Sequence, residues 1–357
     1  MPIRELLFVR LNSSALPQLE LGTVSSVESI AIDRDCAERG IGGISTRAWE
    51  LATSFGTPGV SSAVLFKLTG YLQMPPSEIP LDKLSKDILS DAGMTAELMR
   101  FSNSASFGLR RKITDIGGAL RLLGGSRAVS LLLSSGIRSA GRSSLRRLPP
   151  ALQSWYQMRT ILTASVSSVF AEKHYKLSGD TALVLGLLQD MGILVLAKAL
   201  GNPYLGLIER SRTHGMLRLQ AAEREQLQLD HAEVGAALAR HWQLPNQLAG
   251  PIRFHHDSEE DGNGRGEGLA FVAPMRIGEA FANLWDNRHP SRHEALSRLL
   301  ADCPGNGSVE CQKSLEVAAS RAAEVSNLLH LPVPAEDELI ATCKEILASS
   351  NTVASGS

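Results

Sequence analysis

The chain has 357 residues, a length that predicts one large domain or two modest domains. Hydrophobic residues make up 43% of it and charged residues 20%, as in globular proteins that bury a substantial core. The formal net charge of −1 excludes a general electrostatic attraction to nucleic acid or to an acidic membrane surface. We therefore expect neither a membrane nor a nucleic acid as a direct partner.

The four cysteines show no CxxC spacing, and no segment resembles a signal peptide. A reducing, cytoplasmic compartment is the predicted location. Cys303 and Cys311 flank a short loop and could approach each other, but we expect two free thiols.

The first 45 residues differ from the rest of the chain. Residues 6–9 and 27–32 have the composition of short strands, and glycines at 40, 42 and 43 end the segment. Residues 1–45 are predicted to form an α/β-like or irregular arm that packs on the main body. A remnant of an α/β module such as a receiver domain is the alternative, but no paired acidic residues follow the first strand, so phosphoacceptor function is not expected.

From residue 46 onward the apolar residues recur at three- and four-residue spacings, which predicts an all-α fold. Residues 46–137 are expected to form an N-terminal helical half. Asn103 and Ser104 stand at a predicted helix end, where their side chains are expected to cap free backbone groups.

Residues 138–150 are predicted to be a surface linker, because they are basic and end in two prolines. Arg142, Arg146 and Arg147 are candidate contacts for an acidic protein partner. The alternative is a solvated linker without a binding role.

Residues 151–290 are expected to form a second helical half, packed against the first. Its most apolar helix, predicted at 181–200, carries Gln189 and Asp190 at its centre. A charge at the centre of a bilayer costs roughly 3 kcal/mol, which favours a buried core helix over a membrane span. Residues 291–348 are a predicted helical extension, and residues 349–357 are expected to be disordered.

Several short motifs, in order between about residue 60 and about residue 290, resemble one protein family. Residues 186–192 read GLLQDMG and resemble the Gly-Leu-Leu-His-Asp-Ile-Gly run of the HD superfamily of metal-dependent phosphohydrolases. The other motifs resemble the HD-related output domain, HDOD, a bacterial signalling family. They are the runs RFSNSA at 100–105, ITDI at 113–116, ALRLLG at 119–124, DHAEVG at 230–235 and WQLP at 242–245. The resemblance implies two packed helical subdomains, the second of them HD-like, over residues 46–290.

In active HD enzymes a first histidine, a His-Asp pair and later histidines or an aspartate hold the metal ions. Carried over to this chain, the resemblance puts Gln157 and Gln189 at two of the histidine positions. A glutamine amide is a weaker metal ligand than an imidazole. The polar residues that remain from the pattern are Asp190, His231, His255, His256 and Glu279.

A catalytic metal centre needs three or more well-placed protein ligands and an open position. We therefore expect no metal, no cofactor and no catalysis, although Asp190, His231, His255 and His256 remain weak metal candidates. A buried polar network that joins helices is the favoured interpretation of these residues, and one of the paired histidines is expected to face inward and the other outward.

The resemblance implies a non-catalytic output or scaffold protein of signal transduction, which acts through protein contacts and regulates gene expression. A metal-dependent phosphohydrolase acting on a nucleotide or cyclic dinucleotide is the alternative. A third hypothesis is a sensor that binds a nucleotide without cleaving it.

Overall fold

The computed structural model describes residues 44–55, 62–213, 218–257, 268–305, 308–331 and 333–354. These residues form helices and connecting turns without a strand, so the predicted all-α fold is confirmed for them. The predicted N-terminal arm falls almost wholly outside the described residues, as does the loop that follows Asp257.

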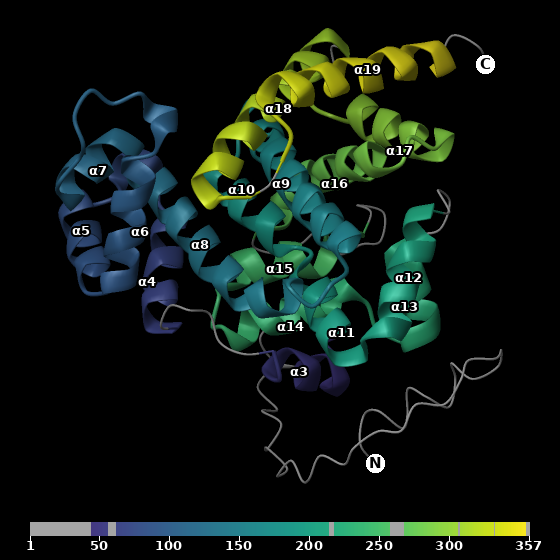
Figure 1. Ribbon diagram of the computed structural model, residues 1–357, viewed down its shortest axis with the longest axis horizontal. Coiled ribbons are helices and arrows are strands. Elements are labelled where there is room, and N and C mark those ends of the chain that lie inside the picture. The colour runs from purple at the N-terminus through teal and green to yellow at the C-terminus, as the bar shows by residue number, and fades with distance from the viewer. Residues whose placement is uncertain are drawn as a thin grey trace.

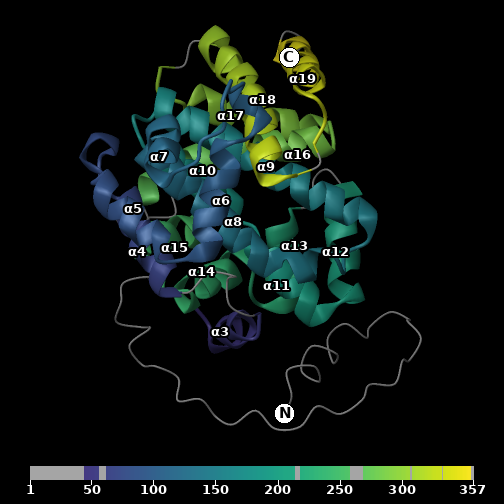
Figure 2. The same ribbon diagram turned by 60° about the vertical axis from the view of Figure 1, so that its left-hand side comes forward.

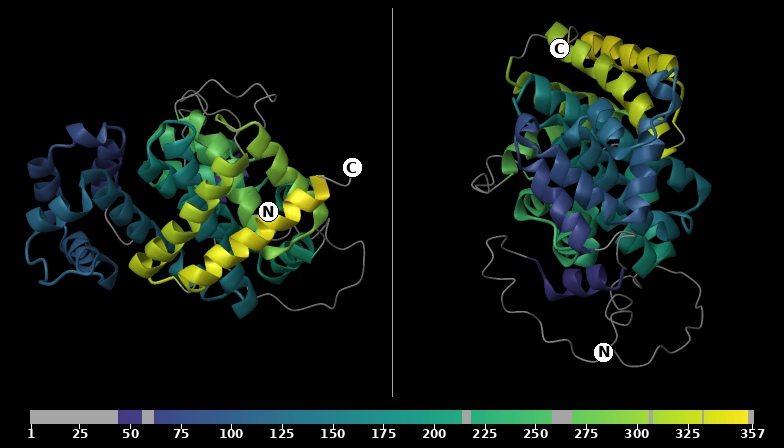
Figure 3. Two further views of the ribbon diagram at one scale, coloured as in Figure 1. Left: turned by 90° about the horizontal axis from the view of Figure 1, so that it is seen from above. Right: turned by 90° about the vertical axis from the view of Figure 1, so that its left-hand side faces the viewer.

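The first helices after α3 form a lobe at one side of the molecule (Figures 1 and 3). Leu84, Ile88, Leu98 and Phe101 are among the side chains that fill its core. The lobe consists of α4 (Ser62–Leu72), the short helix η1 (Pro76–Glu78), α5 (Leu81–Leu89), α6 (Ala92–Ser102), the short helix η2 (Ala105–Phe107) and α7 (Ile116–Leu123).

The long helix α8 (Gly125–Leu145) connects this lobe to the rest of the protein. It packs on α4, α6 and α7 at one side and on α10 and α11 at the other. The prediction of a linker at 138–150 is therefore wrong for residues 138–145, which are helical. A Cβ atom on Gly141 would lie 2.9 Å from Leu194, so this glycine serves close helix packing and not flexibility.

The second half is built around α9 (Pro150–Lys173), whose side chains are buried along most of its length. Three helices pack on it, namely α16 (Val272–Asp286), α10 (Gly179–Leu188) and α18 (Ser308–Leu329). The remaining helices of this half are α11 (Met191–Leu200), α12 (Asn202–Thr213), α13 (Leu219–Leu227), α14 (His231–His241), α15 (Asn246–Phe254) and the short helix η4 (Leu269–Phe271).

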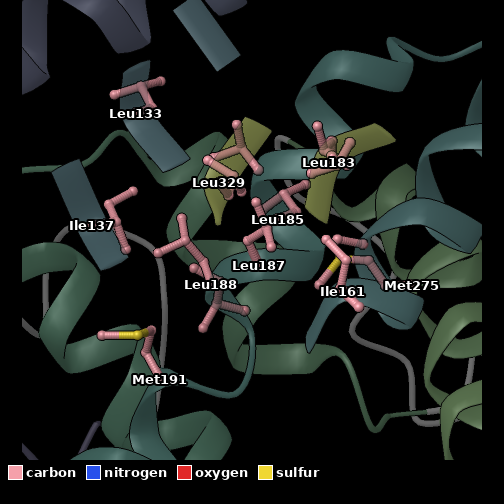
Figure 4. Close-up of a cluster of buried hydrophobic side chains, with 14 of the residues drawn as sticks. Leu133, Ile137, Ile161, Leu183, Leu185, Leu187, Leu188, Met191, Met275 and Leu329 are labelled. Atoms are coloured by element: carbon pink, nitrogen blue, oxygen red, sulfur yellow. The ribbon is translucent and has the colours of Figure 1, made fainter. Parts of the chain in front are cut away.

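The apolar stretch predicted as one helix at 181–200 is two helices, α10 and α11, with Gln189 and Asp190 between them. By length and composition alone the stretch Gly179–Leu200 could cross a membrane, but 78% of its most apolar window is buried inside the protein. The stretch is therefore buried like the core helices of a globular domain. Figure 4 shows its leucines, among them Leu185 and Leu188, between α8, α9 and the end of α18.

The helix α3 (Thr46–Thr53) packs on α14 and α11 of the second half (Figure 2). The prediction that the first half begins at residue 46 is therefore wrong for this helix. The backbone N–H of Ser45 donates to Glu233 at 2.7 Å, and Arg47 donates to the carbonyl of Leu227.

The C-terminal extension contains α17 (Pro290–Ala301), α18 (Ser308–Leu329) and α19 (Glu336–Ala354). The prediction of a disordered tail from residue 349 is wrong as far as Ala354, because α19 continues to that residue.

Three arginines of the first half hold the C-terminal end of α18. Arg100 donates to the Leu328 carbonyl at 2.8 Å, Arg138 donates to the carbonyl of Leu329, and Arg127 pairs with Glu324. Cations are favourable at a helix C-terminus, where carbonyl groups have no partner within the helix. The two halves and the extension are therefore packed together.

Candidate functional site

Five of the predicted site residues meet at one place in the second half. Asp190 stands between α10 and α11, His231 begins α14, His255 and His256 follow α15, and Glu279 lies on α16. Asp190 and His255 are fully buried, and His231 is 1% exposed. The side chains of His256 and Glu279 are 12% and 14% exposed, so the cluster reaches the surface on that side.

Two glycines of the 186–192 motif let the helices approach closely enough to form the cluster. A Cβ atom on Gly192 would lie 1.9 Å from the carbonyl oxygen of His231, which brings α11 and α14 into backbone contact beside Asp190. A Cβ atom on Gly186 would lie 2.4 Å from the Cα atom of Ala164 on α9. Real Cβ atoms do not tolerate such distances, so both positions require glycine.

A buried arginine holds the two carboxylates of the cluster. Arg159 on α9 donates from Nε to Asp190 Oδ2 at 2.7 Å and from Nη2 to Glu279 Oε1 at 2.8 Å. It also donates to the side chain of Asn283. The arginine is 6% exposed, so this is a buried ion-pair network in which the cation is a guanidinium.

A second set of contacts orients His231. Its Nδ1–H donates to Glu223 Oε2 at 2.6 Å, and the same oxygen accepts the backbone N–H of His231 at 2.9 Å. The other oxygen of Glu223 accepts the hydroxyl of Tyr204. On its far side the ring of His231 meets His256, with 2.8 Å between their Nε2 atoms.

The two adjacent histidines both face the cluster, so the prediction that one of them faces outward is wrong. His255 donates through Nδ1 to the Ile252 carbonyl at 2.7 Å, and its buried Nε2 atom has no hydrogen-bond partner in the part of the chain that the structure describes. His256 Nδ1 lies 3.2 Å from Glu279 Oε2. The chain turns immediately after α15, and this turn brings both rings inward.

The guanidinium sets the charge of the two carboxylates. Burial alone would raise the pKa of Asp190, but Arg159 and the histidines around it lower that pKa below its ordinary value. Burial likewise opposes ionisation of Glu279, but His256 and Arg159 hold its pKa well below the ordinary range. Both groups are carboxylates at neutral pH, and together they raise the pKa of Arg159 against the effect of its burial.

The neighbouring histidines titrate in opposite directions. Burial lowers the pKa of His231, but the Glu223 carboxylate outweighs this effect and raises the pKa to about 9. Burial and the adjacent His256 ring lower the pKa of His255 to about 3. At neutral pH His231 is therefore a cation that donates from both nitrogens, whereas His255 is neutral.

As they stand, these side chains are bonded to one another and to Arg159 where a catalytic divalent metal would need them. The Nε2 atoms of His231 and His256 are 2.8 Å apart and are joined by a hydrogen bond. The carboxylates that such an ion would need already bind Arg159. His255 Nε2 is the one nitrogen of the three rings that bonds to nothing within the described residues.

The two glutamines predicted at ligand positions are not part of this network. Gln157 is half-buried on α9, two residues before Arg159, and residues two apart do not share a helix face. Arg159, and not Gln157, is thus the α9 residue that reaches the cluster. Gln189 is fully buried, and its side-chain amide has no hydrogen-bond partner among the described residues.

Asn103 and Ser104 are capping residues of the first half. Asn103 ends α6, donates to the carbonyls of Met99 and Ile113, and accepts the backbone N–H of Ile113 at 2.8 Å. Ser104 caps the short helix η2 by accepting from Ser106. These bonds use the Asn103 amide fully to fix the following loop.

The predicted partner contacts lie at the end of α8. Arg142, Arg146 and Arg147 are exposed. Arg138, one helical turn before Arg142, is instead largely buried, and its burial lowers its pKa to about 10.

Comparison with known proteins gives one family. The family model described as the HDOD domain matches residues 61–258, more than half of the chain and somewhat less than the predicted range of 46–290. A curated relative, an uncharacterized protein of Treponema pallidum (strain Nichols), is 30% identical over 185 residues. This alignment covers 50% of the present chain but only 34% of that relative.

Among solved structures, an HDOD domain protein with unknown function from Geobacter sulfurreducens has a similar fold. The two superpose with a TM-score of 0.57 over 79% of this chain and 98% of that one, at 20% sequence identity. At this identity the likeness concerns the fold alone.

Proposed function

Because the chain belongs to the HDOD family, we propose that it is a non-catalytic output or scaffold module of bacterial signal transduction. It acts in the cytoplasm through contacts with other proteins and takes part in regulating gene expression.

The observation that carries this proposal is the position of Arg159. Its guanidinium binds Asp190 and Glu279 together, and these are the two carboxylates that a metal-dependent hydrolase would offer to its ion. An arginine cannot be deprotonated in a protein and has no open coordination position at which water could become a nucleophile. The cluster thus has the charge balance of a metal site but lacks its reactivity.

A second candidate function rests on the histidines. His231, His255 and His256 can each offer a ring nitrogen, and these atoms lie within 4.8 Å of one another. If Arg159 swung out, the cluster would have the donor set of a phosphohydrolase. A site that binds a nucleotide without turnover is the corresponding sensor hypothesis.

Manganese binding separates these candidates, because Mn²⁺ prefers oxygen and imidazole ligands. The wild-type protein should bind no Mn²⁺ at the cluster, whereas Arg159→Ala should bind it through the two freed carboxylates. Electron paramagnetic resonance of added Mn²⁺ measures the bound fraction. The matched control is Arg212→Ala, which removes an arginine from a pair with Asp286 outside the cluster.

An activity assay tests the same point directly. With manganese, iron or magnesium present, the wild-type protein should hydrolyse neither cyclic dinucleotides nor generic phosphoesters. Turnover that disappears in Asp190→Asn would overturn the non-catalytic proposal and favour the phosphohydrolase.

Partner capture tests the scaffold role. Charge reversal at Arg142, Arg146 and Arg147 should leave the fold intact, because exposed substitutions usually cost less than about 0.5 kcal/mol. It should weaken capture of an acidic partner from the native cell, and salt should weaken capture by the wild type in the same way. Charge reversal of the exposed Arg110 and Arg111 is the matched control. If neither salt nor either set of charge reversals changes the amount of partner captured, the interface lies elsewhere.

A further inference from the structure

A second cluster of metal-ligand side chains lies away from the arginine-centred site. His174 ends α9, Cys303 follows α17, and Cys311 lies in the first turn of α18. One ligand atom from each residue lies within 4.8 Å of the other two. Cys303 and Cys311 are each 2% exposed and His174 is 8% exposed, so the three groups face one another in the interior.

We propose that His174, Cys303 and Cys311 bind a zinc ion, which fastens the C-terminal extension to the end of α9. Two thiolates and a neutral imidazole are a typical zinc donor set, and a water molecule would complete a tetrahedron.

The geometry is close to what zinc requires. With metal–sulfur bonds of about 2.3 Å and metal–nitrogen bonds of about 2.0 Å, the ligand atoms of a tetrahedral site lie roughly 3.5–3.8 Å apart. Separations of up to 4.8 Å therefore close onto an ion by side-chain shifts of about 1 Å.

Both nitrogens of the imidazole have hydrogen-bond partners that can hold the ring in place. His174 Nδ1 lies 3.1 Å from the carbonyl of Pro304, and Nε2 lies 2.9 Å from the hydroxyl of Ser314. Whichever nitrogen binds zinc, the other keeps a hydrogen-bond acceptor, and such an acceptor typically orients a zinc-bound histidine. The ring also stacks on Phe170, with centroids 4.9 Å apart.

Charge balance favours the same assignment. Binding releases one proton from each thiol to solvent, and two thiolates then neutralise the divalent ion. The buried site thus carries no net charge, which avoids the large cost of an unpaired buried ion. The histidine adds a nitrogen ligand within 4.8 Å of the two sulfur atoms, which a simple cysteine pair would lack.

Two of the three ligands lie beyond the residues that the family model matches. Cys303 and Cys311 follow the matched residues 61–258, whereas His174 lies within them. The zinc ion would therefore join the family domain to the C-terminal extension, beside the packing of α18 on α9.

The experiment measures zinc in the full-length protein, purified under reducing conditions and equilibrated with zinc and a competing chelator. We expect one zinc ion per chain. Cys303→Ser, Cys311→Ser and His174→Gln should each bind it at least about 100-fold more weakly, because losing only a group that hydrogen-bonds to a ligand already costs about 10–100-fold. Cys343→Ser is the matched control, a buried thiol of the same extension that donates to the Leu315 carbonyl outside the cluster.

Cobalt provides a readout that does not depend on variants. Co²⁺ bound in place of zinc should give the intense near-ultraviolet charge-transfer absorption of thiolate ligands, and circular dichroism verifies that each variant is folded. The proposal is overturned if the folded wild type takes up neither metal. It is equally overturned if uptake survives both serine variants, or if non-reducing peptide mapping finds a Cys303–Cys311 disulfide in place of zinc.

Discussion

Replacing Asp190 by asparagine removes the charge of the central carboxylate with almost no change in volume. Asp190 is fully buried and accepts from Arg159 at 2.7 Å, and His231 lies 3.5 Å from its other oxygen. Breaking a buried ion pair by neutralising one partner typically costs 3–5 kcal/mol. Arg159 keeps Glu279 as a partner, so we expect a cost at the lower end, about 3 kcal/mol.

Thermal unfolding followed by circular dichroism measures this cost. At about 2.1 cal/mol/K per residue, the 357 residues have an unfolding entropy of about 0.75 kcal/mol/K, so a loss of about 3 kcal/mol should lower the melting temperature of Asp190→Asn by about 4 °C. Urea unfolding should show a lower midpoint with an unchanged slope. Asp82→Asn, at an exposed position of α5, is the control and should change stability by less than about 0.5 kcal/mol.

The network also predicts that the stability costs of substitutions within it do not simply add. Replacing the whole ion group in Arg159→Met/Asp190→Asn/Glu279→Gln should cost less than the sum of the three single changes, because no uncompensated charge is left buried. If Asp190→Asn has the melting temperature of the wild type, or if the three stability costs simply add, the interpretation of Arg159 as the central cation is wrong.

The free energy of unfolding should pass through a maximum near pH 6.5, because His255 reduces it below this pH and His231 reduces it above. The raised pKa of His231 gives stability that is complete below its ordinary pKa of 6.5 and is lost between pH 6.5 and about 9. The lowered pKa of His255 gives stability that is complete above pH 6.5 and is lost as pH falls toward about 3. Melting temperatures across this range should show both slopes, and His231→Gln should flatten only the alkaline one; an unchanged alkaline slope would contradict the assignment. Gly192→Ala should destabilise by at least about 3 kcal/mol in urea unfolding, because its Cβ atom would lie 1.9 Å from a backbone oxygen that cannot move aside. Gly206→Ala, which would meet only the flexible end of Arg210 at 3.6 Å, should be neutral or slightly stabilising; equal effects would argue against the close helix crossing.

The helical pattern could be predicted from the sequence because apolar periodicity depends on local spacing. The same local logic failed at residues 138–145. Glycine, serine and arginine there suggest a linker, but Gly141 and Ser144 are buried where α8 packs in the interior. Only the positions of α10 and α11 show that small residues are needed there for close helix packing.

The candidate site was predicted in part. Asp190, His231, His256 and Glu279 could be placed together because the motif order fixes which helices carry them. Arg159 was overlooked because the comparison of ligand positions pointed to Gln157. A single cation among the apolar residues of α9 was nevertheless a signal, since a buried charge needs a counter-charge. Glu223 gave a weaker signal, because it shares a helix face with Leu219 and Leu227.

The continuity of α8 has a mechanical consequence. At about 1.5 Å per residue its 21 residues form a rod about 30 Å long, with the first lobe around its beginning and the exposed Arg142 at its end. A rotation of about 10° at one end of such a rod displaces the other by about 5 Å, more than a hydrogen bond can span. A force applied at the arginine end would therefore reach the lobe through a continuous rod, and the contacts of Arg100, Arg127 and Arg138 with α18 would brace the rod against rotation.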